Sequence, residues 1–179
     1  MRLNMLPIQY LSKLIKILRS AASPSQIAGG FILGMVIGLS PTFFNLINLF
    51  IIFLIIILNV NIATAIFSYA IFSALGYILD PVFHSLGYTV LVNVSWLKGL
   101  WTSLYNVPVF PFTRYNNTVV MGSVITSVIL LVPMFYLIKR FIVNYREKYE
   151  PRVKNLKWIK LVKSTQLYQW YEKLKFLGD

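Results

Sequence analysis

The chain contains no cysteine, a single histidine (His84) and only five acidic residues among its 179 positions. Without cysteine it can form neither disulfide bonds nor thiolate metal centres. One histidine and one nearby acid cannot supply the ligands of a metal site. A membrane enzyme acting on lipid would also need paired acids, a serine–histidine pair or a metal cluster at one depth. We therefore expect no metal, no cofactor and no enzymatic centre.

Charged residues are scarce as well, at 12% of the chain, whereas 58% of the residues are hydrophobic. Soluble domains carry about 25% charged residues. Between Ser20 and Leu137 the only charged residues are Asp80, Lys98 and Arg114. A chain that cannot cover its apolar residues with polar ones must use lipid as solvent. The composition therefore predicts an all-α integral membrane protein.

The basic residues gather at the two ends of the chain, and the formal net charge is +12. Arg2, Lys13, Lys16 and Arg19 precede the first apolar run, and eleven of the seventeen lysines and arginines lie from Lys139 onward. The positive-inside rule then places both termini in the cytoplasm. We expect the basic tail to meet an anionic membrane surface rather than nucleic acid, because it directly follows a membrane span.

Three regions follow from these patterns. Residues 1-22 form an amphipathic cytoplasmic helix, 23-140 the membrane domain and 141-179 a basic amphipathic cytoplasmic tail. In both end segments apolar residues recur at helical spacing, with lysines and arginines between them. Packing of either segment on protein instead of lipid is the alternative.

Within the membrane domain we expect short helices at 26-39, 42-58, 62-79 and 82-95, a non-cytoplasmic loop at 96-117 and a span at 118-140. The first helix is too short for a hydrocarbon core of about 30 Å. Pro41 disfavours helix at the residue before it and removes a backbone donor. This pattern favours a re-entrant hairpin around Ser40 and Pro41, and one kinked, strongly tilted span is the alternative.

Two groups of residues in this domain are candidate sites. Gly30, Gly34 and Gly38 recur every four residues, so they line one helix face and allow another backbone to approach closely. The same face could instead be exposed to a ligand. Unpaired backbone at Ser40 and Pro41 must be buried in protein or face water, which makes this break a candidate contact for a lipid headgroup.

A second candidate site lies at Asp80, the only acid of the apolar region, and at His84 four residues on. On a helix the two would be neighbours, able to touch a headgroup or relay a proton. The simpler alternative is that Asp80 caps a helix that begins at Pro81, with His84 at the membrane interface.

Aromatic residues crowd the expected outer loop, as they do at bilayer interfaces. With few basic residues the loop belongs on the non-cytoplasmic side, where it could dock a partner. The candidate partner-facing residues are Trp96, Trp101, Tyr105, Phe110 and Phe112.

Two blocks of the chain form a recognisable pattern. The first comprises Ser23-Pro24, Ile27-Ala28, the three spaced glycines and Pro41, and the second comprises Asn59, Asp80-Pro81 and Leu86-Gly87. These blocks resemble a bacterial inner-membrane family known as domain of unknown function 2062. Asp80 stands where this family usually has Asn. The chain's length and basic tail resemble a branch encoded beside large AsmA-like envelope proteins, which have a lipid-lined periplasmic groove.

That resemblance implies a function that the residues alone do not give. We expect a non-enzymatic inner-membrane subunit that partners a large AsmA-like periplasmic protein in phospholipid transport between the inner and outer membranes. The alternative is a stand-alone small transporter or flippase-like carrier that uses Asp80 and His84. The family's usual Asn at the position of Asp80 argues against proton coupling.

Overall fold

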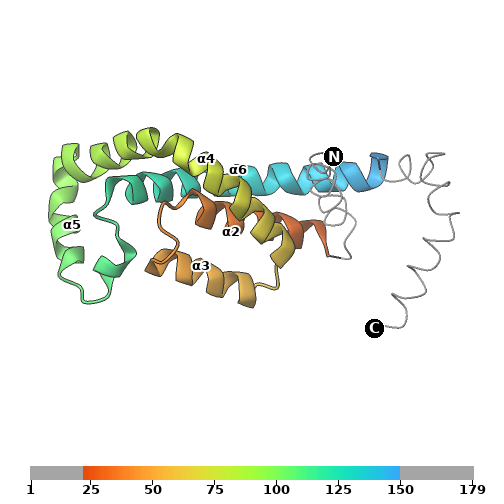
Figure 1. Ribbon diagram of the computed structural model, residues 1–179, viewed down its shortest axis with the longest axis horizontal. Coiled ribbons are helices and arrows are strands. Elements are labelled where there is room, and N and C mark those ends of the chain that lie inside the picture. Colours follow the sequence, from red (N-terminus) through yellow and green to blue (C-terminus); the bar gives the residue numbers. More distant parts are fainter. Residues whose placement is uncertain (1–21, 150–179) are drawn as a thin grey trace, which may run out of the picture. The chain divides into compact units, whose positions relative to one another are not determined.

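The computed structural model describes residues 22–149, and every regular element within that range is helical (Figure 1). The expected amphipathic helix at 1-22 and most of the basic tail lie outside the described residues. The chain divides into two compact units, 1–139 and 140–179. The helices are α2 (Pro24–Leu39), α3 (Leu46–Ile57), α4 (Ile62–Tyr88), α5 (Lys98–Tyr105) and α6 (Thr118–Asn144).

Shorter turns complete the described chain. A π-helical turn, η1 (Thr89–Asn93), extends α4, and 3-10 turns η2 (Ser95–Leu97) and η3 (Phe110–Thr113) flank α5. In the second unit the described residues comprise the end of α6 and the π-helical turn η4 (Tyr145–Tyr149).

Helix α2 starts and stops where its sequence dictates. Ser23 is the N-cap: its hydroxyl accepts from the Gln26 amide at 3.2 Å, and the Ser23 amide donates to the Gln26 side chain at 2.8 Å. This capping box satisfies two of the free donors at a helix start. The helix ends before Pro41, which cannot supply a backbone donor. Ten of its sixteen residues are buried, so α2 forms the centre of the first unit.

Helices α2 and α3 form a helical hairpin. The chain turns at residues 40–45, and α3 then runs back toward the start of α2. At the open end, the Gln26 side chain donates to the Asn59 carbonyl at 3.2 Å, and the Asn61 amide donates to the Gln26 carbonyl at 3.0 Å. The start of α2 and the end of α3 therefore lie side by side.

Helix α3 begins at Leu46, four residues later than the expected 42-58. The side chain of Asn45 accepts from the Asn48 amide at 2.8 Å and so caps the helix. Asparagine is a strong N-cap residue, and capping at this position outweighs an earlier start directly after the proline.

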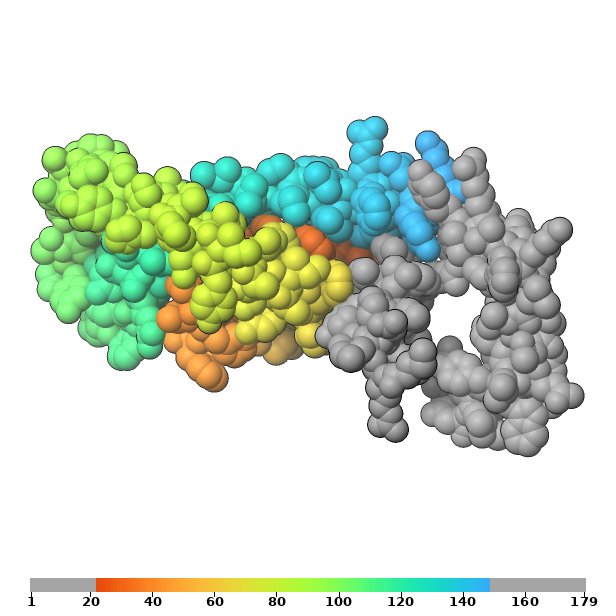
Figure 2. All heavy atoms as spheres, turned by 45° about the horizontal axis from the view of Figure 1, so that its top comes forward, coloured from red at the N-terminus to blue at the C-terminus, as the bar shows by residue number. Residues whose placement is uncertain are grey.

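Helix α4 runs parallel to α2 and packs on its glycine face. A Cβ added to Gly30 would collide with the Asn61 carbonyl, and one added to Gly34 would collide with the Ala65 carbonyl. Further along, a Cβ added to Gly38 would lie 2.8 Å from the Tyr69 carbonyl. The residue numbers of the contacts rise together along α2 and α4, so the two helices run in the same direction. Helix α2 consequently shows only as a narrow strip between α4 and α6 in Figure 2.

The expected break of α4 at Pro81 is wrong. Residues 62-79 and 82-95 were predicted as separate helices with Asp80 as the second N-cap, but Pro81 lies inside one continuous helix. Tertiary packing on both sides of the proline accounts for the difference. Gly76 contacts the end of α2, and Gly87 abuts the backbone of α6 at Thr118. Such packing outweighs the cost of about 3 kcal/mol for a proline inside a helix.

Helix α6 packs antiparallel to the second half of α4. A Cβ on Gly122 would strike the Phe83 carbonyl, and one on Gly87 would strike the Thr118 carbonyl. Phe83 also joins Met35 and Leu39 of α2 in a buried cluster. The three helices therefore share one core beneath the middle of α4.

The segment expected as a loop at 96-117 is largely helical, since it contains α5 and two 3-10 turns. Helix α5 lacks a side-chain cap and has no buried residue. At eight residues it is shorter than the window over which helical periodicity is recognised, and it lies in a stretch rich in proline and aromatic residues, which explains why the sequence did not reveal it.

The outward faces of the long helices are apolar. Ile56 of α3, Ile78 of α4 and Ile129 of α6 are all at least 65% exposed, and many large apolar residues resemble them. The stretches Ile62–Asn93 and Thr118–Lys148 are long and apolar enough to cross a membrane, whereas α2 and α3 are shorter. Exposed apolar faces of this extent need a cover of lipid or protein.

Candidate functional site

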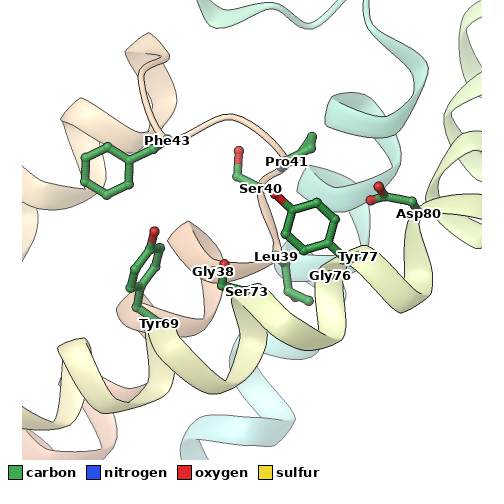
Figure 3. Close-up of a pocket in the computed structure, with 10 residues that line it drawn as sticks. All are labelled: Gly38, Leu39, Ser40, Pro41, Phe43, Tyr69, Ser73, Gly76, Tyr77 and Asp80. Carbon is green, nitrogen blue, oxygen red and sulfur yellow. The ribbon is translucent and has the colours of Figure 1, made fainter.

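A cavity of about 140 Å³ lies where the tip of the α2–α3 hairpin meets α4 (Figure 3). We call it the tip pocket. It brings together residues that the sequence offered as two separate candidates, the break at Ser40 and Pro41 and the acid Asp80. The hairpin contributes Gly38, Leu39, Ser40, Pro41 and Phe43, and α4 contributes Tyr69, Ser73, Gly76, Tyr77 and Asp80.

Two buried asparagines hold the hairpin tip in place. The Asn45 side-chain amide donates to the Thr42 carbonyl at 2.8 Å, and that of Asn48 donates to the same carbonyl at 2.9 Å and to the Phe43 carbonyl at 3.1 Å. Asn45 also donates to the Ser40 hydroxyl at 3.1 Å. These bonds satisfy backbone that the proline break leaves unpaired, as a nonaqueous surrounding requires.

Sequence reasoning missed both asparagines. The available signal was their spacing of three residues at the start of an otherwise apolar run, which places both amides on one side of a helix. Asn48 is fully buried, and its side-chain oxygen has no hydrogen-bond partner among residues 22–149.

Asp80 is half-buried at the α4 side of the tip pocket, and Figure 3 shows its carboxylate turned toward Pro41 and Tyr77. Tyr69, Ser73 and Tyr77 of the same helix also line the cavity, and each carries a hydroxyl. Within residues 22–149, none of these four side chains forms a hydrogen bond or ion pair. The tip pocket thus combines the Asp80 carboxylate with three hydroxyls that have no hydrogen-bond partner among residues 22–149.

His84 lies elsewhere. Its Nδ1 is 2.7 Å from the Thr118 hydroxyl of α6, and its ring centroid is 6.1 Å from that of Tyr88. No ion pair joins it to Asp80 in the described part of the chain, and it does not line the tip pocket. The two residues stand four positions apart on the continuous helix α4, as the sequence suggested, but His84 is bonded to Thr118 rather than to Asp80 in the described residues.

The glycine row divides between two environments. Gly30 and Gly34 are buried directly under the α4 backbone, which leaves no room there for a ligand. Gly38 is also buried, but it stands at the end of the row and lines the tip pocket. The row thus sets how closely α4 approaches, and its last member borders the cavity.

The aromatic residues of the outer segment separate into an inner and an outer group. Trp101 and Phe110 pack around buried Tyr115, with ring centroids 5.9 and 5.0 Å from it. Trp96 is 80% and Phe112 70% exposed, and Tyr105 is exposed as well. Only these last three are free to meet a partner.

Tyr115 anchors the inner group. Its hydroxyl donates to the Trp101 carbonyl at 2.6 Å, and the Trp101 ring nitrogen donates to the Val90 carbonyl at 3.3 Å. Burial, and secondarily the nearby Tyr105, raises the pKa of Tyr115 above its usual value. The hydroxyl therefore stays protonated, and able to donate, throughout the neutral range.

Comparison with known proteins gave one match. A family model described as "Uncharacterized protein conserved in bacteria (DUF2062)" covers residues 9–150. No curated protein and no solved structure matched the chain. The match includes the hairpin, α4, the outer segment and α6.

Proposed function

The chain belongs to this DUF2062 family of bacterial proteins, and on that premise we propose that it is an inner-membrane protein that handles phospholipid at the hairpin tip. It acts without catalysis, as the subunit that delivers lipid to a large AsmA-like periplasmic protein for transport to the outer membrane. The tip pocket is the observation that carries the lipid-handling part. The AsmA-like partner rests on the resemblance of the sequence.

The proposed topology has two crossings, α4 and α6. These helices are antiparallel, so the chain leaves and re-enters the cytoplasm once, and both termini are cytoplasmic, as the basic ends favour. The α2–α3 hairpin opens and closes at the level of Gln26 and Asn61, which supports re-entry from the cytoplasmic side. The two end segments then lie as amphipathic helices on the cytoplasmic leaflet.

Helix lengths support a hairpin that stops inside the bilayer. The sixteen residues of α2 span about 24 Å and the twelve of α3 about 18 Å, both short of a hydrocarbon core of about 30 Å. The hairpin tip lies beside Gly76, near the middle of the stretch Ile62–Asn93. The tip pocket is therefore placed at membrane depth in this proposal.

A polar cavity at that depth lowers the cost of moving a lipid headgroup through apolar surroundings, because hydroxyl and carboxylate groups replace part of its hydration. The outward apolar faces of α3 and α4 accommodate the acyl chains meanwhile. Exposed Trp96, Tyr105 and Phe112 on the other side of the bilayer are the proposed contact for the periplasmic partner.

Single-cysteine labelling tests the topology cleanly because the native chain has no cysteine. Cysteines at Asn59 and Asn106 are expected to react with impermeant reagent from the cytoplasmic and periplasmic sides, respectively. A cysteine at Ser40 is expected to be reached only from the cytoplasmic side. Reaction of the Ser40 position only from the periplasm would show that α2 crosses fully and would overturn the re-entrant proposal.

Copurification tests the partnership. In mild detergent, the full chain is expected to retain a large AsmA-like periplasmic protein, and alanine at Trp96 and Phe112 together should weaken that retention. Alanine at exposed Tyr136 of α6, far along the chain from the outer segment, is the matched control. Purification of the chain alone, with phospholipid transport to the outer membrane intact in a deletion strain, would refute the partnership.

The stand-alone carrier with proton coupling has less support. It requires Asp80 and His84 to exchange a proton, and within residues 22–149 no ion pair joins them, whereas the Nδ1 of His84 lies 2.7 Å from the Thr118 hydroxyl. We therefore keep the subunit function as the proposal.

A further inference from the structure

The tip pocket has a charge that the lipid-handling proposal leaves unexplained. Asp80 is the one acid that lines it, and no lysine, arginine or histidine lies among the described lining residues. A carboxylate at membrane depth is costly unless a positive partner accompanies it. Since the described chain supplies no such partner, the positive charge arrives with the ligand.

The rest of the lining suits a cation with a phosphate beside it. The rings of Phe43 and Tyr69 meet edge to face, with centroids 5.8 Å apart, and Tyr77 adds a third ring at the same cavity. Aromatic faces attract ammonium groups. The free hydroxyls of Tyr69, Ser73 and Tyr77 are donors of the kind that phosphate oxygens accept.

The size of the cavity limits what enters it. A cavity of about 150 Å³ holds a molecule the size of benzene, and the tip pocket is of that order at about 140 Å³. An ethanolamine group fits this space together with part of its phosphate, whereas a whole lipid does not. The acyl chains stay outside, along exposed apolar residues such as Phe44 and Ile78.

We propose that the tip pocket binds the primary ammonium of a phosphoethanolamine headgroup, with Asp80 as its counter-ion and the pocket hydroxyls at its phosphate. The proposal rests on the membrane placement above and adds the lipid class: phosphatidylethanolamine in preference to phosphatidylglycerol. Phosphatidylglycerol brings a negative charge and no amine, so Asp80 repels it.

Native mass spectrometry of the full chain, delipidated in mild detergent, measures this preference. The protein is titrated with phosphatidylethanolamine or phosphatidylglycerol of identical acyl chains. We expect the wild type to bind phosphatidylethanolamine about tenfold more tightly than phosphatidylglycerol. A difference of this size is what one hydrogen bond to a charged group contributes. Equal affinity for the two lipids in the wild type would overturn the proposal.

Asp80→Asn keeps the shape of the side chain and removes its charge. We expect the preference to fall to about twofold or less, because binding of phosphatidylethanolamine weakens and that of phosphatidylglycerol improves. Asp80→Glu keeps the charge and should keep the preference for phosphatidylethanolamine. This variant controls for a folding defect caused by any substitution at position 80. Glu147→Gln, at the other acid among residues 22–149, is the matched control and should leave the preference unchanged. An unchanged preference in Asp80→Asn would overturn the assignment of Asp80.

A competition arm identifies the source of the ammonium. Free ethanolamine or phosphoethanolamine at millimolar concentration should displace little lipid, because neither has the acyl chains that α3 and α4 bind. Full displacement by the free amine would show a soluble ligand and overturn the lipid assignment.

These outcomes are separable from the proposed function. Loss of lipid preference with the AsmA-like protein still copurifying would remove only this inference. Retained preference without the partner would remove only the partnership.

Discussion

At the scale of single residues, the glycines of α2 matter for what they lack. At Gly34 a Cβ would overlap the backbone of Ala65, which cannot move aside as a flexible side chain could. The spacing of these glycines in the sequence predicts that another backbone approaches α2 closely. It could not show that this neighbour is α4, because the contact joins residues thirty-one positions apart.

Replacing Gly34 by alanine should therefore destabilise the protein. We expect a loss of about 1–3 kcal/mol, as for other overpacked cores, measured as a lower midpoint of thermal unfolding in detergent. Gly99→Ala in α5 is the control, because nothing lies within 4 Å of its added Cβ. If the two variants unfolded alike, the close approach of α4 to α2 would be wrong.

Asn48 is the residue whose role the sequence concealed most. It reads as one polar residue in an apolar run, yet it holds two carbonyls of the hairpin tip. Only the folded turn brings those carbonyls within reach of its amide.

Asn48→Leu is expected to leave both carbonyls without this donor. Each carbonyl keeps a bond from Asn45, whose side chain donates to Thr42 and whose backbone amide donates to Phe43. The loss is therefore that of two hydrogen bonds, about 0.5–1.5 kcal/mol each, and the variant should unfold at a lower denaturant concentration. Exposed Asn116, which forms no hydrogen bond among the described residues, is the control as Asn116→Leu. Wild-type stability in Asn48→Leu would contradict the arrangement of the tip.

At the scale of elements, α4 departs most from what the sequence favours. Asp80-Pro81 has the form of a helix boundary, with a capping side chain followed by a proline. The structure continues the helix because α2 supports it before the proline and α6 supports it afterwards. Local preference therefore yields to packing from two sides.

Because Pro81 lies inside a continuous helix, replacing it by alanine should stabilise the protein. Alanine restores a backbone donor within a helix that already exists, so stability should rise by up to about 3 kcal/mol. Thermal unfolding in detergent measures it, and Pro133→Ala in α6 gives a second proline inside a helix for comparison. A marked loss of stability in Pro81→Ala would instead indicate two helices separated at the proline.

At the scale of the whole molecule, the apolar surface is the dominant property. Large apolar side chains are exposed along α3, α4 and α6, and two stretches are long enough to cross a bilayer. In water such faces would associate with one another.

We therefore expect the protein to stay with the membrane fraction after an alkaline carbonate wash and after high salt. Detergent should be required to release it, because burial of apolar surface, unlike surface ion pairs, is not screened by salt. Release by salt alone would indicate a peripheral protein held by its basic ends.

The sequence by itself determined the helical class, the family, the short first helix and the break before Pro41. These depend on composition, on hydrophobic periodicity and on proline, which act within a few residues. It also marked Ser40, Pro41 and Asp80 as residues of interest, but as two sites.

The folded turn decided that Asn45 and Asn48 hold the tip, and within residues 22–149 no ion pair joins Asp80 to His84. Only the packing of distant segments decided that Ser40, Pro41 and Asp80 border one cavity. The reason is the parallel packing of α2 on α4, which is a contact between segments distant in the chain. Local sequence patterns specify which face of each helix is apolar or small. Which faces pack together depends on how all the helices fit around one another.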